Sequence, residues 1–556
     1  MVSFRSFLSG SAILQGLALL GAVALAENTT NTTNTTNVTT SGRYYNSETI
    51  TFPPAPTIPS FPPAAPIPIK RNASIAIIGA GPAGIHHALL LAQKGFSNIV
   101  MYEYSDEIGG KSKTIVDETG LPHEMGTCYA HALYDPIFQL LNTYDPNNVL
   151  VPIDPTVPTN TWIIQDNQIL YDYATYLVQQ AQALTGLTTL LGIKNATQVA
   201  FVKYITLHES IFGKYSYGLP PQPKDWTQLA GTALNFIQIN DLQVIQPWFQ
   251  TMFERQGYGS LSTTPAFYLL WWGHPDLVRR YLALASQNKP FVYLLSKGFQ
   301  SLWKTIAAVN TAEFTVKLRS AVTRISRRDS KPQLTIRQWA ENSNCLTDGK
   351  TVTVSHDHIV MAIDLSISSV DLSTDKGFPA VIDDLDAREK WLYQGYKSSA
   401  FVTTKFTSPS ISHESAVEWW PQRGQGDAQG RLQLARNTRI TLTNSTLLNA
   451  TSGNQTRVAY QHYEPDLAVT ARKTYQATLS RDLSTAFPSS RNLTSFFSSY
   501  APRTTKDKLV LNQPWAIWNY QGQHHTTWIG SSVSFESVLD VVTYNQKLVD
   551  RIQIVN

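Results

Sequence analysis

Residues 74–103 constrain the fold of this chain more than any other segment. They read as a short apolar strand, a glycine turn (79–84), a helix (85–94) and a second strand that ends at Glu103. The helical stretch contains alanine and leucine without an internal breaker, and Gly95 is well placed to end it in the left-handed conformation. This order is typical of a βαβ unit, so the sequence predicts an α/β domain built around a parallel sheet.

The turn has the spacing Gly-x-Gly-x-x-Gly, and each glycine has a physical task. Gly79 allows the tight turn, Gly81 lets a pyrophosphate approach the backbone, and Gly84 lets the helix and the strand pack closely. The N-terminus of the helix offers free N–H groups and partial positive charge to the phosphates. The acid that ends the second strand, about 20 residues further on, would bind the ribose hydroxyls. We therefore predict a dinucleotide site formed by Gly79, Ala80, Gly81, Pro82, Ala83, Gly84 and Glu103.

Further segments resemble the FAD-dependent amine oxidase and phytoene desaturase superfamily. Residues 107–111 look like its Gly-Gly-Arg/Lys segment, and residues 123–127 look like its acid-x-Gly step beside the flavin. Residues 358–362 resemble the strand that closes the FAD fold, and residues 527–531 resemble its second FAD motif. The resemblance implies one bound FAD. The further contacts that it implies are Gly110, Lys111, Gly126, Thr127, Val322, Gly530, Ser531, Glu536 and Val538.

The resemblance also implies how the chain is organised. An α/β Rossmann-like FAD-binding domain is interrupted by two insertions, which form an α+β substrate domain with a mixed sheet and helices. The FAD-binding parts are residues 71–135, 290–370 and 506–556, and the substrate-domain parts are residues 136–289 and 371–505. In the second insertion the alternation from Ala400 to Phe406 is typical of a strand.

Candidate catalytic residues are few, because a flavin mainly needs a substrate C–H held about 3–3.5 Å from its N5 atom. Many oxidases of the superfamily hold a lysine there. The resemblance places Ser399 near that position and Lys397 slightly displaced, so Lys397 is a weak catalytic candidate and a solvated strand-end lysine is the preferred interpretation. The aromatic segment before the second FAD motif offers Trp515, Trp518 and Tyr520, and we expect Tyr520 to contact the substrate. The sequence assigns no other catalytic side chain.

The sequence of the first 70 residues predicts a targeting signal and a flexible stalk rather than a folded domain. Residues 1–26 have a positive start, an apolar stretch and a small-x-small end, which is typical of a signal peptide, with a membrane anchor as the alternative. Residues 27–70 are rich in Asn, Thr and Pro, which favours a flexible glycosylated stalk. We expect a secreted protein or one of the secretory-pathway lumen. The sequons begin at Asn28, Asn31, Asn34, Asn37, Asn72, Asn195, Asn444, Asn449, Asn454 and Asn492.

The cysteine and histidine patterns are less informative. Cys128 and Cys345 are the two cysteines of the chain, so at most one disulfide within the chain can form. For Cys128, ordinary burial, a disulfide to Cys345 and covalent attachment to the flavin all stay open. His524 and His525 are adjacent and diverge on an extended chain, and zinc-ligand spacing is absent, so we predict no metal site.

The charge pattern excludes a nucleic-acid partner, because the net charge is +4 and the longest basic runs are pairs. Residues 534–536 (Ser-Phe-Glu) are similar to the second motif of fungal β-cyclopiazonate dehydrogenase-like secreted flavoproteins, which implies oxidative ring closure or desaturation. We predict an FAD-dependent oxidoreductase, a dehydrogenase or oxidase. It would pass a hydride to flavin N5 from a small aromatic or nitrogen-containing specialised metabolite, and oxygen or another acceptor would take the electrons. The alternatives are an amine oxidase that produces hydrogen peroxide and a non-redox binding protein of the same fold.

Overall fold

The computed structural model describes most of the chain after residue 58. The described residues are 59–153, 161–165, 168–170, 173–328, 331–341, 343, 348–365, 381–393, 395–410, 414–423, 428–437 and 453–556. The predicted signal peptide, most of the predicted stalk and Cys345 lie outside these residues. None of the described helices is both long enough and apolar enough to cross a membrane.

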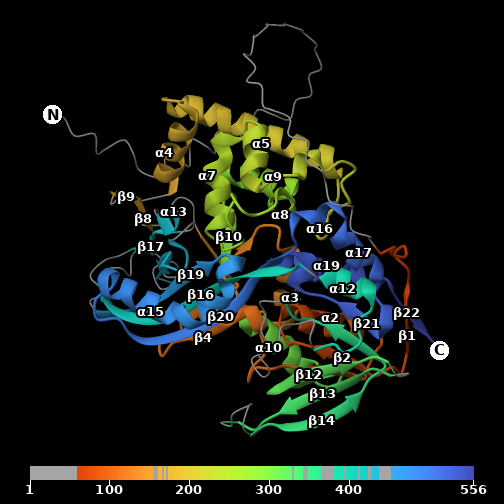
Figure 1. Ribbon diagram of the computed structural model, residues 1–556. Coiled ribbons are helices and arrows are strands. Elements are labelled where there is room, and N and C mark those ends of the chain that lie inside the picture. Colours follow the sequence, from red (N-terminus) through yellow and green to blue (C-terminus); the bar gives the residue numbers. More distant parts are fainter. Residues whose placement is uncertain are drawn as a thin grey trace, which may run out of the picture.

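A five-stranded parallel sheet forms the centre of the FAD-binding domain, in the order β11-β3-β2-β15-β21. The central strand β2 and its neighbour β15 are buried at every residue, and apart from His358 at the start of β15 their sequences are continuous apolar runs. Helices α2 and α19 pack against each other beside this sheet (Figure 1). The bounds are β2 Ile75–Ile78, α2 Pro82–Gln93, β3 Ile99–Tyr102, β11 Phe314–Lys317, β15 His358–Met361, β21 Thr526–Trp528 and α19 Val538–Asp550. The predicted α/β fold is confirmed.

Two smaller sheets complete this domain. An antiparallel sheet of β12 Ser320–Ser326, β13 Gln333–Gln338 and β14 Lys350–Ser355 extends from its lower edge in Figure 1. Strand β1, Ile67–Lys70, pairs in parallel with β22, Ile552–Val555, at the C-terminus of the chain. The stalk boundary that we drew at residue 70 is therefore too late, because the apolar alternation of β1 gives it a buried face on the body of the protein.

The insertions that we predict to form a substrate domain contain a seven-stranded mixed sheet in the order β20-β16-β19-β18-β17-β8-β9. The β17–β8 pair is parallel and every other pair is antiparallel. The predicted strand from Ala400 to Phe406 lies within β16. The bounds are β8 Thr161–Gln165, β9 Gln168–Leu170, β16 Lys397–Ser410, β17 Ala416–Glu418, β18 Leu434–Arg436, β19 Gly453–Tyr463 and β20 Arg491–Arg503.

Each face of this sheet has a different neighbour. Helix α15, Ala468–Ala486, packs on β16 and β19 from one side. The opposite side faces the FAD-binding domain, since the hydroxyl of Thr403 on β16 donates to the Met125 carbonyl at 2.7 Å. We call this second side the site face.

The first insertion forms a helical lobe at the top of Figure 1. Its main helices are α4 Tyr173–Thr185, α5 Leu190–Phe212, α7 Gln246–Phe249, α8 Ala266–Trp272 and α9 Pro275–Ala285. The aromatic runs of this insertion, including Trp248 and Trp271, are buried in the lobe's own apolar core. They stabilise the lobe by burial of apolar area.

Candidate functional site

The glycine turn has the geometry that its spacing predicts. Gly79 has φ of +104°, a conformation that favours glycine. A Cβ atom at Gly84 would lie well inside contact distance of the Gly79 carbonyl oxygen, so helix α2 can approach β2 only with glycine there. A Cβ atom at Gly81 would meet nothing closer than the Cα atom of Gly110, at 3.7 Å. The turn therefore leaves open space next to the start of α2.

The N-terminus of α2 fits a phosphate ligand. Gly81 is its N-cap, no side chain caps it, and Pro82 occupies the first turn. The Gly81 carbonyl accepts from Ile85 N at 3.0 Å, and no described group accepts from the N–H groups of Ala83 or Gly84. Such free donors at the positive end of a helix dipole bind the pyrophosphate of a dinucleotide.

Glu103 lies at the carboxyl end of β3, beside the same turn. Its Oε2 atom accepts from Ala80 N at 2.7 Å, and its Oε1 atom accepts from Ser105 N at 2.8 Å. The Glu103 carbonyl accepts from Ser320 N, at the start of the strand that holds Val322. Glu103, the predicted ribose ligand, is therefore bonded to the strand that carries Val322, the predicted adenine contact.

Lys111 joins the two FAD motifs. Its Nζ atom lies 2.9 Å from Glu536 Oε2 and donates to Ser531 Oγ at 3.1 Å. The side chain of Glu536 is only 4% exposed, and burial raises the pKa of its carboxyl while Lys111 opposes that rise. A Cβ atom at Gly530 would lie 3.6 Å from the Cβ of Ala83. The first and the second predicted FAD motif thus meet at one place, as binding of a single FAD requires.

Gly126 and Thr127 pack against the backbone of Lys111. A Cβ atom at Gly126 would overlap the Lys111 carbonyl oxygen, which also accepts from Thr127 N at 2.9 Å. Val538 is buried at the first turn of α19, where Ser537 caps the helix through Asp540 N. The residues therefore fit FAD: the glycine turn and Lys111 would hold its phosphate end, and residues 126–127 together with the start of α19 would hold its ring.

The site face lies against the predicted flavin segment. Because side chains alternate along a strand, the cross-strand partners Thr403 and Tyr460, and the partners Val458 and Arg436, project from the same face. Phe401 and Leu434 also project there, and these side chains pack with Met125 in one apolar cluster. The substrate-side surface next to the flavin segment therefore comes from β16, β18 and β19.

Four aromatic rings form a continuous row along this face. Tyr258 of the first insertion stacks on Tyr500 of β20 with ring centroids 5.9 Å apart, and Tyr500 stacks on Phe401 at 5.0 Å. Phe401 contacts Tyr460 at 5.6 Å. At the other end Tyr258 contacts Phe535, in the second FAD motif, at 5.2 Å. We call Tyr258, Tyr500, Phe401 and Tyr460 the aromatic row.

Arg436 stands at the Tyr460 end of the aromatic row. Its guanidinium carbon lies 5.5 Å from the Tyr460 ring centroid and 5.8 Å from that of Tyr129. One amino group donates to the Glu124 carbonyl at 3.1 Å, and the other contacts the Cys128 sulfur. Arg436 is buried, and its Nε atom has no hydrogen-bond partner among the described residues.

Buried carboxyls and thiols near this point are neutral over much of the pH range. Burial raises the pKa of Glu124 to about 8, although hydrogen bonds from Thr114 Oγ1 and Phe299 N oppose the rise. Burial also raises the pKa of the Cys128 thiol to about 11. Cys128 is a free, buried cysteine here, and its predicted partner Cys345 lies outside the described residues.

The structure does not support the candidate substrate and catalytic residues from the sequence. Lys397 forms an ion pair with Asp466 at 2.6 Å, and more than half of its side chain is exposed. Tyr520, the predicted substrate contact, donates to Asp386 at 2.5 Å and packs edge-on against Phe61 inside the FAD-binding domain. Tyr520 lies on the helix Gln513–Tyr520 and not on the site face, and the amino group of Lys397 is held by its ion pair at the exposed start of β16. The ring of Tyr520 packs in the apolar core of the FAD-binding domain, apart from the aromatic row.

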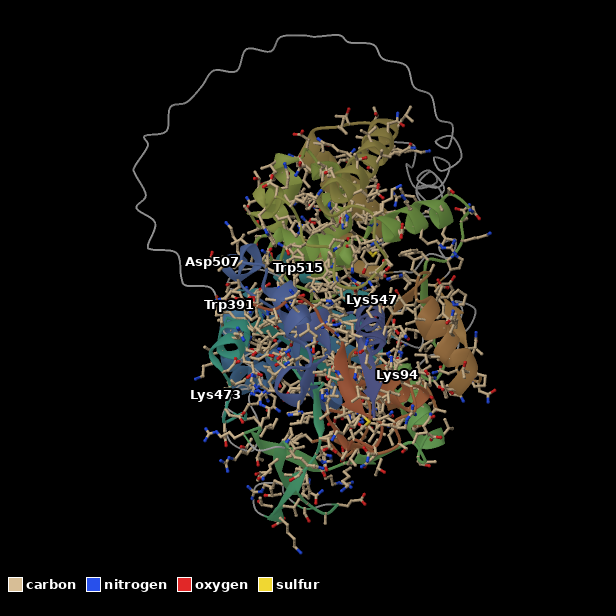
Figure 2. The ribbon with its side chains drawn as sticks, turned by 90° about the vertical axis from the view of Figure 1, so that its right-hand side faces the viewer. Lys94, Trp391, Lys473, Asp507, Trp515 and Lys547 are labelled. Atoms are coloured by element: carbon tan, nitrogen blue, oxygen red, sulfur yellow. The ribbon has the colours of Figure 1, made fainter. Side chains whose placement is uncertain are left out.

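The two tryptophans of that segment are structural as well. Trp515 donates to the Pro220 carbonyl at 2.8 Å and lies beneath the helical lobe, as Figure 2 shows. Trp518 packs edge-on against Tyr544 of α19. Ser399 is buried on the site face, and its hydroxyl has no hydrogen-bond partner among the described residues.

One cluster of two carboxylates and a histidine has the spacing of a possible metal site. Asp386, Glu389 and His524 bring ligand atoms within 4.8 Å of one another. Glu389 already binds Arg327 at 2.6 and 2.7 Å, and Asp386 accepts from Tyr520. The cluster therefore has partners for its charges within the protein.

A small cavity of about 90 Å³ borders the sheet near the aromatic row. It is lined in part by His462 and Gln433 of the sheet region and by Glu254 and Ser260 of the first insertion. None of the predicted FAD contacts lines it. It is much smaller than the roughly 300–1,000 Å³ typical of a ligand pocket.

The sequence analysis did not identify the aromatic row or Arg436. The alternation around Val458 and Tyr460 is a strand signal that could have placed these side chains on one face. No sequence signal distinguishes Arg436 from the surface arginines, because its burial depends on contacts between distant segments.

Comparisons with known proteins agree with this geometry. The protein family described as "Flavin containing amine oxidoreductase" matches residues 82–491. A polyenoic fatty acid isomerase of Ptilota filicina is 22% identical over 495 residues, which cover 84% of this chain and 92% of that protein. The crystal structure of a CLA-producing fatty acid isomerase from P. acnes superposes with a TM-score of 0.65 at 18% identity, covering 87% of this chain and 100% of that one. Putrescine oxidase bound to putrescine gives a TM-score of 0.55 at 13% identity, covering 87% and 99%. At these identities the solved structures establish a common fold.

Proposed function

The chain belongs to the flavin-containing amine oxidoreductase family and is an FAD-dependent enzyme, and from this premise we propose that it moves double bonds along an unsaturated acyl chain. The aromatic row carries this proposal. Its four rings place an apolar surface between the flavin segment and the second FAD motif. Two of the relatives are described as fatty acid isomerases, which supports an acyl chain as the ligand of this surface.

The proposed reaction has no net redox change. A hydrogen leaves an allylic carbon with its bonding electron pair, and an equivalent hydride returns to another carbon of the same chain while the double bonds shift. Substrate and product have the same formula, so neither oxygen nor a nicotinamide is consumed. When bound, FAD supplies the electron-accepting ring for such chemistry.

The residues of this chain would orient the substrate and exclude water. Thr403 fixes β16 to the Met125 carbonyl, so the distance between the site face and the flavin segment is set by a direct hydrogen bond. Phe401 and Tyr460 are buried and offer their faces and edges to an apolar chain. A rigid, dry surface of this kind keeps one C–H bond in place and protects a reactive substrate from water.

The resemblance to β-cyclopiazonate dehydrogenase-like flavoproteins gives a second candidate. If the hydride is not returned, the same arrangement desaturates or cyclises an aromatic or nitrogen-containing metabolite, and oxygen or another acceptor takes the electrons. The stacked pairs Tyr258–Tyr500 and Tyr500–Phe401 favour this reading, because a flat ligand can extend such a stack.

Turnover under anaerobic conditions separates these functions. We expect the purified FAD-loaded protein to convert a non-conjugated polyunsaturated fatty acid, such as linoleic acid, into a conjugated isomer without oxygen, seen as new diene absorbance in the ultraviolet. A saturated acid of equal length is the control. Putrescine oxidation with release of hydrogen peroxide, together with no diene, would refute the isomerase function.

We also propose that the protein enters the secretory pathway. Four of the predicted sequon asparagines lie among the described residues, and all are exposed: Asn72, Asn195, Asn454 and Asn492. Glycosylation needs such exposure. Treatment of the secreted protein with an N-glycosidase should increase its mobility on a denaturing gel. An unglycosylated protein retained inside the producing cells would contradict the proposal.

A further inference from the structure

We propose that Arg436 anchors the carboxylate of the substrate at the end of the aromatic row. This inference rests on the proposed function and deepens it, because it names the polar end of the ligand and the residue that holds it. It also predicts that the enzyme takes free acids and rejects esters and amines.

The first observation is the charge of Arg436 in its surroundings. Four arginines are buried among the described residues, namely Arg327, Arg436, Arg457 and Arg503. Three of them bind carboxylates directly, with Glu389, Glu414 and Glu464 as their respective partners. Among the described residues, no carboxylate lies within ion-pair distance of Arg436. A buried cation without a counter-ion is costly, so an anion from elsewhere would stabilise it.

The neighbouring groups do not supply that anion. Arg436 contacts a thiol, a backbone carbonyl and two tyrosine rings, which are neutral groups. The carboxyl oxygens of Glu124 accept from Thr114 Oγ1 and Phe299 N and form no ion pair with Arg436, and burial outweighs the opposing effect of Arg436 and raises the pKa of this carboxyl to about 8. Glu418, on the adjacent strand, already binds Arg255 at 2.6 Å. The charge of Arg436 therefore stays uncompensated at the site face.

The second observation is the unused donor. The Nε atom of Arg436 is buried and has no partner among the described residues. Guanidinium groups bind carboxylates best through two parallel N–H···O bonds, which use Nε and one amino group. A substrate carboxylate at this edge of the guanidinium would satisfy the free donor and neutralise the charge together.

The third observation is the position of Arg436 relative to the flavin segment. Its hydrogen bond to the Glu124 carbonyl places it two residues from Gly126, while its contact with the Tyr460 ring places it at the end of the aromatic row. An acyl chain with its carboxylate on Arg436 would run along Tyr460 and Phe401 toward Tyr500. The double bonds of the chain, and not its carboxylate, would then lie further along the row.

The test measures binding of three probes of equal chain length to the FAD-loaded protein. The probes are laurate, methyl laurate and dodecylamine, and binding is followed by the change in flavin absorbance and by calorimetry. We expect laurate to bind about 10- to 100-fold more tightly than methyl laurate, which is the range for a charged hydrogen-bonded pair. Dodecylamine should bind more weakly than the ester, because like charges repel.

Variants assign this preference to the residue. Arg436→Gln should lower the affinity for laurate to that for methyl laurate and leave the affinity for the ester unchanged. Arg436→Lys keeps the positive charge but loses the two parallel N–H donors of the guanidinium, and it should retain part of the preference for laurate over methyl laurate. Lys397→Gln, which removes a surface charge from the same sheet, should bind all three probes as the parent protein does.

Two results would overturn the inference. One is equal binding of laurate and methyl laurate by the parent protein, as expected if the chain itself supplies a counter-ion. The other is an Arg436→Gln protein that loads FAD and still prefers laurate. If Arg436→Gln does not fold, Arg436→Lys and the comparison of probes decide. An Arg436-dependent preference without isomerisation of linoleic acid would support the anchor and refute the isomerase function.

Discussion

Two alanine substitutions in the glycine turn should have opposite consequences, although they are three residues apart. At Gly84 a Cβ atom would collide with the Gly79 carbonyl oxygen, which is backbone and cannot move aside as a side chain would. Gly84→Ala must push α2 away from β2. We expect a loss of about 3 kcal/mol in the free energy of unfolding, the upper part of the usual range for an overpacked core.

At Gly81 the same substitution should leave the folded protein intact. Its φ of −77° suits alanine, and the new Cβ would meet only the Gly110 Cα at an ordinary 3.7 Å. Loss of a glycine from the unfolded chain even favours folding, by about 0.4–1 kcal/mol. The new methyl group, however, occupies the space through which a pyrophosphate approaches the start of α2. We expect Gly81→Ala to bind FAD at least about tenfold more weakly, a loss of about 1.4 kcal/mol.

Two measurements separate these effects. Urea unfolding of the flavin-free proteins reports the packing of α2, and the ratio of flavin to protein after gel filtration reports FAD affinity. In excess FAD, at about 100 times its Kd, the parent protein gains about 2.7 kcal/mol, and Gly81→Ala should gain about half of that. A Gly81→Ala protein with normal FAD affinity, or a Gly84→Ala protein with normal stability, would refute the reasoning.

Three further substitutions test charges around the site. Burial raises the pKa of Glu124 to about 8, so the folded protein holds this proton more tightly than the unfolded chain does. The free energy of unfolding should therefore fall as the pH rises from about 4.5 to about 8. Glu124→Gln should reduce that pH dependence, measured by urea unfolding at several pH values. Lys111→Met leaves the buried Glu536 without its cation and should cost about 3–5 kcal/mol near neutral pH. Because burial raises the pKa of Glu536, this cost should decrease as the pH is lowered, and a cost that does not change with pH would contradict the assignment. Lys397→Gln should leave flavin reoxidation by oxygen unchanged in stopped-flow measurements, whereas a large slowing would restore this lysine as a catalytic candidate.

The FAD-binding half of the site could be predicted because its determinants are local. Within residues 74–103 the spacing of three glycines fixes the turn and the helix start, and the structure brings Gly81, Lys111 and Gly530 to one place. The second motif was recognisable for the same reason. Short segments of fixed geometry leave a fixed pattern in the sequence.

The substrate half could not be predicted, because its determinants are distant in the sequence. Tyr258 and Tyr500 stack although 242 positions separate them (500 − 258). Tyr520 lies close to the second motif in sequence, yet its hydroxyl donates to Asp386 and its ring packs in the apolar core of the FAD-binding domain. Nearness in sequence predicts a contact only within one element, and the face that a helix presents is decided by packing.

The register of the substrate sheet decides which charge reaches the ligand. On β19, Val458 and Tyr460 project from the site face, while Arg457 projects toward α15, where it contacts the Phe487 ring and binds Glu414 at 2.6 Å. Arg436 is also a buried arginine, but it lies on the opposite face of the sheet, and no carboxylate among the described residues forms an ion pair with it. Within one sheet, then, the arginine on the packed face carries its own counter-ion, and the arginine on the site face does not. Packing alone would favour a partner in both places, so the difference is best explained if the missing anion arrives with the substrate.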